Sequence, residues 1–291
     1  MEDAFARCHP AVNLLYFALV LTGTMFFWHP ACQLLSLGFG LAYLVYLEHW
    51  PAVCRRLRWM VPLFVLTALI NPAFSHAGAT ILAYFPSGNP LTLESIWFGL
   101  ASAGMLLAAL CWCFCCADIL TTDKIVCLLG RALPALSLLL AMALRFVPRL
   151  RRQMQEIARA QAGLPVRGRG LLARARRGAH LCSALISWAL ENAVVTADSM
   201  KSRGYGLPGR SAFTLYRLSR RDKILLGLEA GGALLMGLAT AAGLFRWNYY
   251  PVVQGTWHGW PVFGIYAALL ALPLLLNWKE DHTWRVLQSN I

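Results

Sequence analysis

Residues 145–163 read RFVPRLRRQMQEIARAQAG and begin the most basic region of the chain, which extends to Lys223. From Arg145 to Lys223 the sequence has 17 of its 26 Lys and Arg residues but only four acidic residues, so this region accounts for the whole net charge of +13. The sequence on either side is nearly neutral and consists largely of apolar runs. Lys and Arg residues close to membrane spans remain on the cytoplasmic side. The pattern therefore predicts a membrane protein whose positive charge lies in one long cytoplasmic loop.

The composition excludes a soluble globular protein, because 58% of the residues are hydrophobic and the mean hydropathy is +0.56. A bilayer core about 30 Å thick requires about 20 predominantly apolar residues in a helix. Six runs are predicted to span the membrane: Ala11–Trp28, Ala31–Leu47, Met60–Phe74, Glu94–Cys116, Ile224–Phe245 and Trp260–Trp278. Glu2 and Asp3 stand where a signal peptide would carry positive charge, so we expect the first run to be a retained span.

The loops between the runs alternate in positive charge. Basic residues precede the first run, follow the second and follow the fourth: Arg7, Arg55, Arg56, Arg58, Lys124 and Arg131. The intervening loop, residues 76–93, has no Lys or Arg. This alternation predicts a multi-pass plasma-membrane protein with both termini and residues 117–223 in the cytoplasm. The last outer turn, Arg246–Gly259, is rich in Trp and Tyr, as is typical at the level of lipid headgroups.

The predicted organisation has three parts. Residues 1–117 carry four transmembrane helices, residues 118–223 form the basic cytoplasmic region, and residues 224–291 carry two further transmembrane helices and a cytoplasmic tail. The apolar run Leu133–Leu144 is too short to cross a bilayer, so we expect a separate helix in or just under the inner interface. The fold class is thus an all-α polytopic membrane protein with a cytoplasmic insert.

The insert is predicted to form two long amphipathic helices. Apolar residues recur at helical spacing in residues 147–161, and this helix ends at Gly163. A second helix begins near Leu171 or after Gly178 and ends at the glycines that follow Arg203. Its predicted apolar face consists of Leu181, Ala184, Leu185, Trp188, Val195 and Met200.

Arg203 precedes the glycine that ends the second helix, and its position has two interpretations. A guanidinium at a helix terminus can donate two hydrogen bonds into an acidic or carbonyl-lined groove of a soluble partner. Alternatively, the positive charge only compensates the negative carboxyl end of its own helix dipole. The spacing alone favours neither interpretation.

Several segments resemble the transmembrane T component of energy-coupling factor (ECF) transporters, a type of ABC transporter. The similarity extends over most of the chain and is strongest in residues 144–149 (LRFVPR), 168–172 (GRGLL) and 197–206 (ADSMKSRGYG). It also includes Asn71-Pro72 and residues 121–124 (TTDK). The resemblance implies two ABC-type ATPase subunits and a substrate-binding membrane subunit as partners, with micronutrient (vitamin or metal ion) uptake as the function.

The resemblance also implies coupling residues at the ends of the two long helices. In the family each coupling helix ends in an Arg-centred triplet that docks on one ATPase, and the second triplet corresponds to Ser202, Arg203 and Gly204. At the first helix end this chain has Ala162 and Gly163 without the expected Arg. Arg159 or Arg167 would have to replace it, which implies unequal contacts with the two ATPases.

The sequence offers no catalytic or cofactor motif, so we predict a non-enzymatic protein without a cofactor. A G-x-x-x-x-G-K-[ST] loop does not occur, and ATP hydrolysis is therefore expected on the partner subunits. Residues Cys111, Cys113, Cys115 and Cys116 lack the paired spacing or His partner of a metal site, and we expect reduced thiols. Few aromatic residues lie within the basic region, which argues against a nucleic-acid partner, whereas acidic lipids of the bilayer would attract it.

The expected function is therefore a non-catalytic transmembrane scaffold that couples ATP-driven motion to a substrate-binding subunit. The alternative is a self-sufficient secondary transporter or channel, and a weaker one is a membrane enzyme. Glu229 is the ionisable residue furthest inside a predicted span, whereas ion pathways usually have clusters of such residues. The pair Gly227 and Gly231 could bring a second helix close, within this chain or from a partner.

Overall fold

The computed structural model describes residues 3–75, 78–84, 90–163, 170–207, 216–255 and 260–289. The described chain is predominantly helical and separates into two compact units. Unit 1 comprises residues 1–124 and 216–291, and unit 2 comprises residues 125–215. The all-α prediction is confirmed, with two short strand pairs added in the loops of unit 1.

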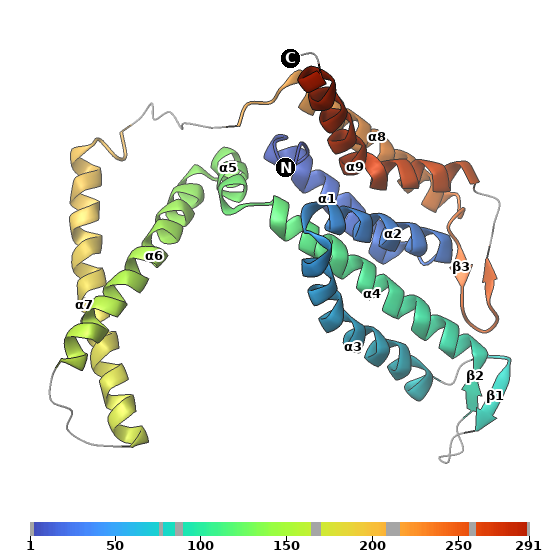
Figure 1. Ribbon diagram of the computed structural model, residues 1–291, viewed down its shortest axis with the longest axis horizontal. Helices are drawn as coiled ribbons and strands as arrows, with labels where there is room; N and C mark the ends of the chain where they lie inside the picture. The colour runs from blue at the N-terminus through green and yellow to red at the C-terminus, as the bar shows by residue number, and fades with distance from the viewer. Residues whose placement is uncertain are drawn as a thin grey trace. The chain divides into compact units, whose positions relative to one another are not determined.

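In its described residues, unit 1 contains six long helices that pack side by side (Figure 1). Their bounds are α1 Pro10–Phe26, α2 Pro30–Leu47, α3 Trp50–Phe74, α4 Leu93–Ile119, α8 Arg220–Ala241 and α9 Trp260–Ser289. A His-Pro pair begins each of the first two: the Nδ1 atoms of His9 and His29 accept the N–H groups of Ala11 and Ala31 at 3.1 and 3.2 Å. Proline is tolerated directly after such a cap because its missing N–H would have no partner within the helix.

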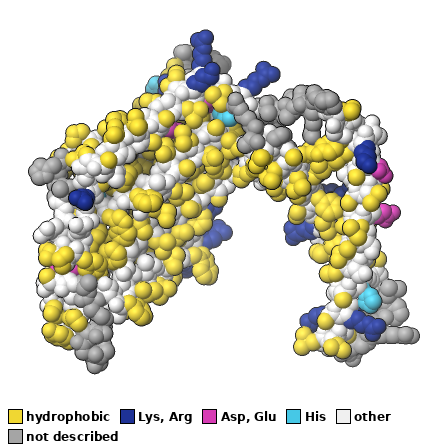
Figure 2. All heavy atoms as spheres, turned by 180° about the vertical axis from the view of Figure 1, so that it is seen from behind, with side chains coloured by type: hydrophobic (Ala, Val, Ile, Leu, Met, Phe, Trp, Pro, Cys, Tyr) yellow, Lys and Arg dark blue, Asp and Glu magenta, His cyan; other side chains and the backbone are white. Residues whose placement is uncertain are grey.

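All six predicted spans coincide with helices of unit 1. Five of them are long and apolar enough to cross a bilayer, and α1, with 17 residues, is a shorter apolar helix. Hydrophobic side chains also cover much of the outer surface of this unit (Figure 2). Because water would strongly disfavour such a surface, we assign these helices to a membrane.

Helix α3 begins at Trp50, ten residues before the predicted start of the third span at Met60. The added turns carry Arg56, which pairs with Glu48 before the helix and with Asp118 of α4, where Nη1 and Oδ2 lie 3.5 Å apart. Its guanidinium also lies 4.7 Å from the centre of the Phe114 ring. A hydropathy pattern ends at such charges, whereas the helix includes them, with Arg56 paired to Glu48 and Asp118.

The core of unit 1 is built around Trp112 of α4, which is completely buried. Its indole Nε1 donates to Ser36 of α2, with the hydroxyl at 3.0 Å and the carbonyl at 3.1 Å. The rings of Tyr16 and Tyr43 lie 6.1 and 6.3 Å away, centre to centre. Gly40 faces the indole closely, since a Cβ there would stand 3.1 Å from Nε1. The tryptophan therefore joins α1, α2 and α4.

Two short strand pairs lie at one end of unit 1. Strands β1 (Ile81–Tyr84) and β2 (Pro90–Thr92) are antiparallel and connect α3 to α4, and β3 (Trp247–Asn248) and β4 (Gln254–Gly255) connect α8 to α9. A backbone hydrogen bond of 3.1 Å from Ala79 to Pro251 joins the two connections. Aromatic rings gather beside them, including the stacked pair Trp28 and Phe98. The sequence predicts this aromatic enrichment but not the strands.

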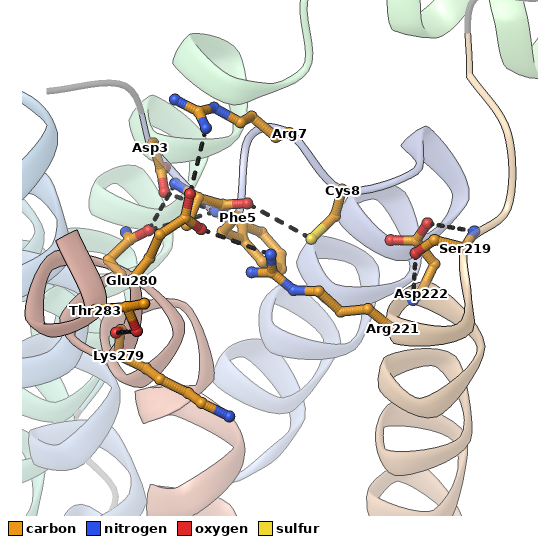
Figure 3. A network of polar contacts seen from close by, with 12 residues as sticks. Asp3, Phe5, Arg7, Cys8, Ser219, Arg221, Asp222, Lys279, Glu280 and Thr283 are labelled. Carbon is orange, nitrogen blue, oxygen red and sulfur yellow. Dashed lines mark hydrogen bonds and ion pairs between the residues drawn. The ribbon is translucent and has the colours of Figure 1, made fainter. Parts of the chain in front are cut away.

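The opposite end of unit 1 is held by the segment before α1 (Figure 3). The Asn277 side chain of α9 accepts the N–H of Ala4 at 2.8 Å, and Tyr43 of α2 donates to Asp3 at 2.6 Å. Asp222 of α8 accepts the N–H of His9 at 3.3 Å. Buried Lys124 donates to the carbonyl of Ile119 at 2.8 Å, and burial lowers the pKa of its ammonium. A segment of seven residues thus connects three helices distant in sequence.

Unit 2 consists of most of α5 (Thr122–Ala132), together with α6 (Pro134–Ala162) and α7 (Leu171–Ser202). The predicted separate helix of residues 133–144 is wrong, because α6 runs without interruption from Pro134 through the basic stretch to Ala162. Pro134 occupies the first helical turn, where proline costs little, so it begins the helix and does not break it. Helix α7 begins at Leu171 and contains Gly178 in its interior, so of the two predicted starts the one near Leu171 is correct.

Candidate coupling site

Helix α7 ends in a Schellman motif formed by residues 200–205. The N–H of Tyr205 donates to the carbonyl of Met200 at 3.0 Å, and the N–H of Gly204 donates to Lys201 at 3.0 Å. Gly204 has φ of +78°, the left-handed conformation that glycine adopts without steric cost. A Cβ at this position would also lie 3.1 Å from Leu207 Cδ1. Gly204 therefore ends α7 sharply, and Arg203 is the C-cap residue of the helix.

The Arg203 side chain is exposed, and it forms no ion pair or hydrogen bond with any residue that the structure describes. Its guanidinium donors are therefore not used to bind the last carbonyls of α7. Ser202, one residue earlier, donates its hydroxyl to the carbonyl of Ser199 at 2.9 Å. Both interpretations of Arg203 remain compatible with this geometry, because a charge compensates a helix dipole without a direct hydrogen bond.

The end of α6 differs from that of α7. Ala162 is its last residue, and Gly163 caps it with φ of −76° and ψ of −10°, without a left-handed turn. Arg159, Ala162 and Gly163 are all exposed, and Arg159 has no ion pair among the described residues. Arg167 lies outside the described residues. The structure thus gives the first helix end a less defined cap, with its nearest Arg one turn back from the terminus.

The two helices meet where Trp188 of α7 contacts α6. The rings of Phe146 and Trp188 are stacked, with centres 6.0 Å apart and planes 15° apart. The guanidinium of Arg149 lies 5.5 Å from the centre of the same indole. The helices cross in this region, and their carboxyl ends lie well apart within unit 2 (Figure 1). The sequence places Trp188 on an apolar face, but it does not indicate its partners, which are distant along the chain.

Much of the apolar surface of these helices is not covered within the chain. No residue of α7 is buried, and Val194 and Val195 are 62% and 63% exposed. On α6, Val147 is 61% exposed. The predicted apolar faces are therefore only partly used for the contact between α6 and α7. Exposed apolar side chains on the last third of α7 lie on the same helix as Arg203, a combination typical of helices that bind in a groove.

The described residues include no candidate metal site. They contain no group of three or more His, Cys, Asp or Glu side chains that could hold a metal. All nine cysteines are free thiols, and of the four in α4 only Cys111 and Cys115 are both buried, as their spacing of four predicts. Glu229 of α8 is completely buried, and neither of its carboxylate oxygens has a hydrogen-bond partner among the described residues.

The helices and the exposed helix pair define a multi-pass membrane protein. The family described as CbiQ, cobalt transport protein, matches residues 7–214. The chain therefore belongs to the CbiQ family, the T components of ECF transporters, and is a component of a membrane transport system.

A second comparison adds a distant relative. The uncharacterized protein MG181 of Mycoplasma genitalium is 37% identical over 92 residues. The aligned part is 31% of this chain but only 22% of the relative, so the chain spans less than a quarter of that protein's length. This similarity therefore does not indicate an activity for the chain.

Proposed function

We propose that this chain is the non-catalytic coupling scaffold of an ECF transporter. In this proposal two ABC-type ATPase subunits grip the ends of α6 and α7, and ATP-driven movement of the ATPases reaches a substrate-binding membrane subunit through the two helices. Family membership and the six apolar helices support a transport role in the membrane. The transported solute is a micronutrient, either a vitamin or a metal ion such as the cobalt in the family's description.

The observation that carries the proposal is the end of α7. A Schellman motif holds Arg203 at the tip of a 32-residue helix, with its side chain exposed and unpaired among the described residues. A stiff helix about 48 Å long can pass a displacement at its tip to its other end. The contact of Phe146 with Trp188 would carry the same displacement to α6. The two ATPases would be held unequally, because the α6 end has no Arg directly before its capping glycine.

The rival function, a self-sufficient secondary transporter or channel, would need a pathway for ions through unit 1. Glu229 is buried by itself, without a polar partner among the described residues. Ion pathways in transporters are usually built from several ionisable or polar groups that face one another. A single enclosed carboxyl does not provide such a path, so the coupling role is the better supported of the two.

Reconstitution in lipid vesicles tests the proposed function. The purified chain alone should neither hydrolyse ATP nor take up the solute, and addition of the two ATPases and a substrate-binding subunit should produce ATP-dependent uptake. The same assembly with ATPases that bind but do not hydrolyse ATP is the control. Uptake by the chain alone, driven only by an ion gradient, would show that it is a secondary transporter.

A second test concerns the orientation, which we propose has both termini and residues 117–223 in the cytoplasm. Tyr84 between α3 and α4 is 68% exposed, and Cys182 on α7 is an exposed thiol. A membrane-impermeant maleimide should label Tyr84→Cys in intact cells but leave the wild type unlabelled. Permeabilised cells should gain a label that Cys182→Ser reduces, and exposed Cys54 should account for part of the remainder. Labelling of Cys182 in intact cells would show that the proposed orientation is wrong.

A further inference from the structure

A cavity of about 260 Å³ lies at the end of unit 1 that the amino-terminal segment holds together. Its wall is formed by side chains from that segment, from α2 and from α9, among them Arg7, Tyr46, Glu280, Asp281, Trp284 and Arg285. The volume is below the range of about 300–1,000 Å³ that is typical of pockets for drug-sized ligands. It is therefore suited to a small group, such as the headgroup of a lipid.

The acidic groups at this cavity already have partners within the chain. Glu280 pairs with Arg7 at 3.2 Å and with Arg221 at 3.5 Å, through different carboxylate oxygens (Figure 3). Asp281 accepts a hydrogen bond of 3.2 Å from the Tyr46 hydroxyl. Arg285, by contrast, is exposed and forms no ion pair among the described residues. Of the two Arg residues on the wall of the cavity, Arg285 is therefore the one without an ion pair among the described residues, and Asp281 is the acid without one.

The cavity also lies where a membrane helix leaves its apolar part. The apolar run of α9 ends at Trp278, and charged residues follow directly from Lys279 onwards. Trp278 and Trp284 are 69% and 55% exposed, and tryptophan is enriched where membrane helices reach the lipid headgroups. The cavity thus lies close to the depth at which phospholipid phosphates surround the protein.

From these observations we propose that the cavity binds the phosphate of an acidic phospholipid headgroup, with Arg285 as its main donor. The guanidinium fork matches two phosphate oxygens, and Trp284 beside it suits the boundary between headgroup and acyl chain. The wall itself has two Arg residues and two acids, and Arg221, which pairs with Glu280 from outside the wall, brings a local surplus of one positive charge. An anionic lipid neutralises this surplus and a zwitterionic lipid does not. The bound lipid would stabilise the junction of the amino-terminal segment with α2 and α9.

The test uses the purified full chain in detergent, without ATPases, so that it does not depend on the proposed coupling function. Phosphatidylglycerol and phosphatidylcholine are added in turn, and bound lipid is counted by native mass spectrometry. The wild type should retain more phosphatidylglycerol than phosphatidylcholine. Arg285→Gln should weaken this binding by roughly tenfold or more, because a charge-assisted hydrogen bond is lost. Lys279→Gln is the matched control, since Lys279 is exposed on the same helix but does not line the cavity.

Two further measurements distinguish loss of lipid binding from loss of the folded structure. Arg285→Gln should melt at the same temperature as the wild type in phosphatidylcholine alone, because the side chain is exposed and unpaired. Arg285→Lys should bind phosphatidylglycerol with intermediate affinity, since it keeps the charge but not the fork. If Lys279→Gln weakened phosphatidylglycerol binding equally, the lipid would be held by general attraction to the basic surface. The proposed site would then be wrong. Glycerol phosphate binding as tightly as phosphatidylglycerol would overturn the assignment to a lipid.

Discussion

Replacing Arg203 with alanine should largely abolish binding of one ATPase subunit to the α7 end. Loss of one member of a hydrogen-bonded charge pair buried in an interface costs about 2–5 kcal/mol, roughly a 30-fold to several-thousand-fold loss of affinity. The physical reason is that Arg203 is exposed and unpaired among the described residues of the free chain, so its hydrogen bonds would be made only to the partner. Co-purification of the ATPase pair with the variant, followed by titration of the separate ATPase, measures the effect.

Arg159→Ala on α6 serves as the matched control for Arg203→Ala. Both side chains are exposed near the end of a long helix, but Arg159 lies a turn before its terminus. An exposed charge pair contributes only about 0–1 kcal/mol, so this variant should retain most of its ATPase. Arg203→Lys should fall between the two, because a single ammonium cannot replace a bidentate guanidinium. Equal retention by all three variants would mean that Arg203 has no role in docking.

Replacing Trp112 with alanine should cause the largest loss of stability in unit 1, about 3–5 kcal/mol. The indole is completely buried between α1, α2 and α4, and its removal would also leave the Ser36 hydroxyl without this donor. Thermal unfolding in detergent micelles measures the change. Trp112→Phe should cost less, because it keeps most of the apolar contact but not the hydrogen bond.

Trp97→Ala in the same helix is the control for Trp112→Ala. The Trp97 side chain is 51% exposed and belongs to the surface that we assign to lipid, so its removal should change the melting temperature little. If the two alanine variants lowered the melting temperature equally, the junction of α1, α2 and α4 at Trp112 would not be the centre of the fold.

Several features of the protein follow from the sequence because they depend on local pattern. The six apolar runs predict the six long helices of unit 1, since a bilayer selects continuous apolar helices. Glycine predicts where both coupling helices end, at Gly163 and Gly204, because only the local backbone matters there. The resemblance in residues 144–149, 168–172 and 197–206 predicts the family, which the match over residues 7–214 confirms. The coupling roles of the residues at the helix ends stay predictions.

Hydropathy and run length mispredict two helix boundaries. Hydropathy places the start of the third span at Met60, whereas α3 begins at Trp50 and its added turns include Arg56, which pairs with Glu48 and Asp118. The run of residues 133–144 reads as a short separate helix, yet it continues into α6 because Pro134 stands in the first turn. The pairing of Arg56 with Asp118 cannot be read from local pattern. The start of α6 at Pro134 follows from a local rule on proline that hydropathy and run length alone do not include.

The sequence by itself determined the class of protein, the membrane helices and the exposed Arg-Gly end of α7, because periodicity, charge and glycine act over a few residues. Only the tertiary structure decided that Trp188 stacks on Phe146, and that Ala4 and Asn277 meet across nearly the whole chain. It also brought Arg7, Tyr46 and Arg285 around one cavity. The physical reason is that these side chains come together only when distant helices pack, and no spacing along the chain encodes which helices become neighbours.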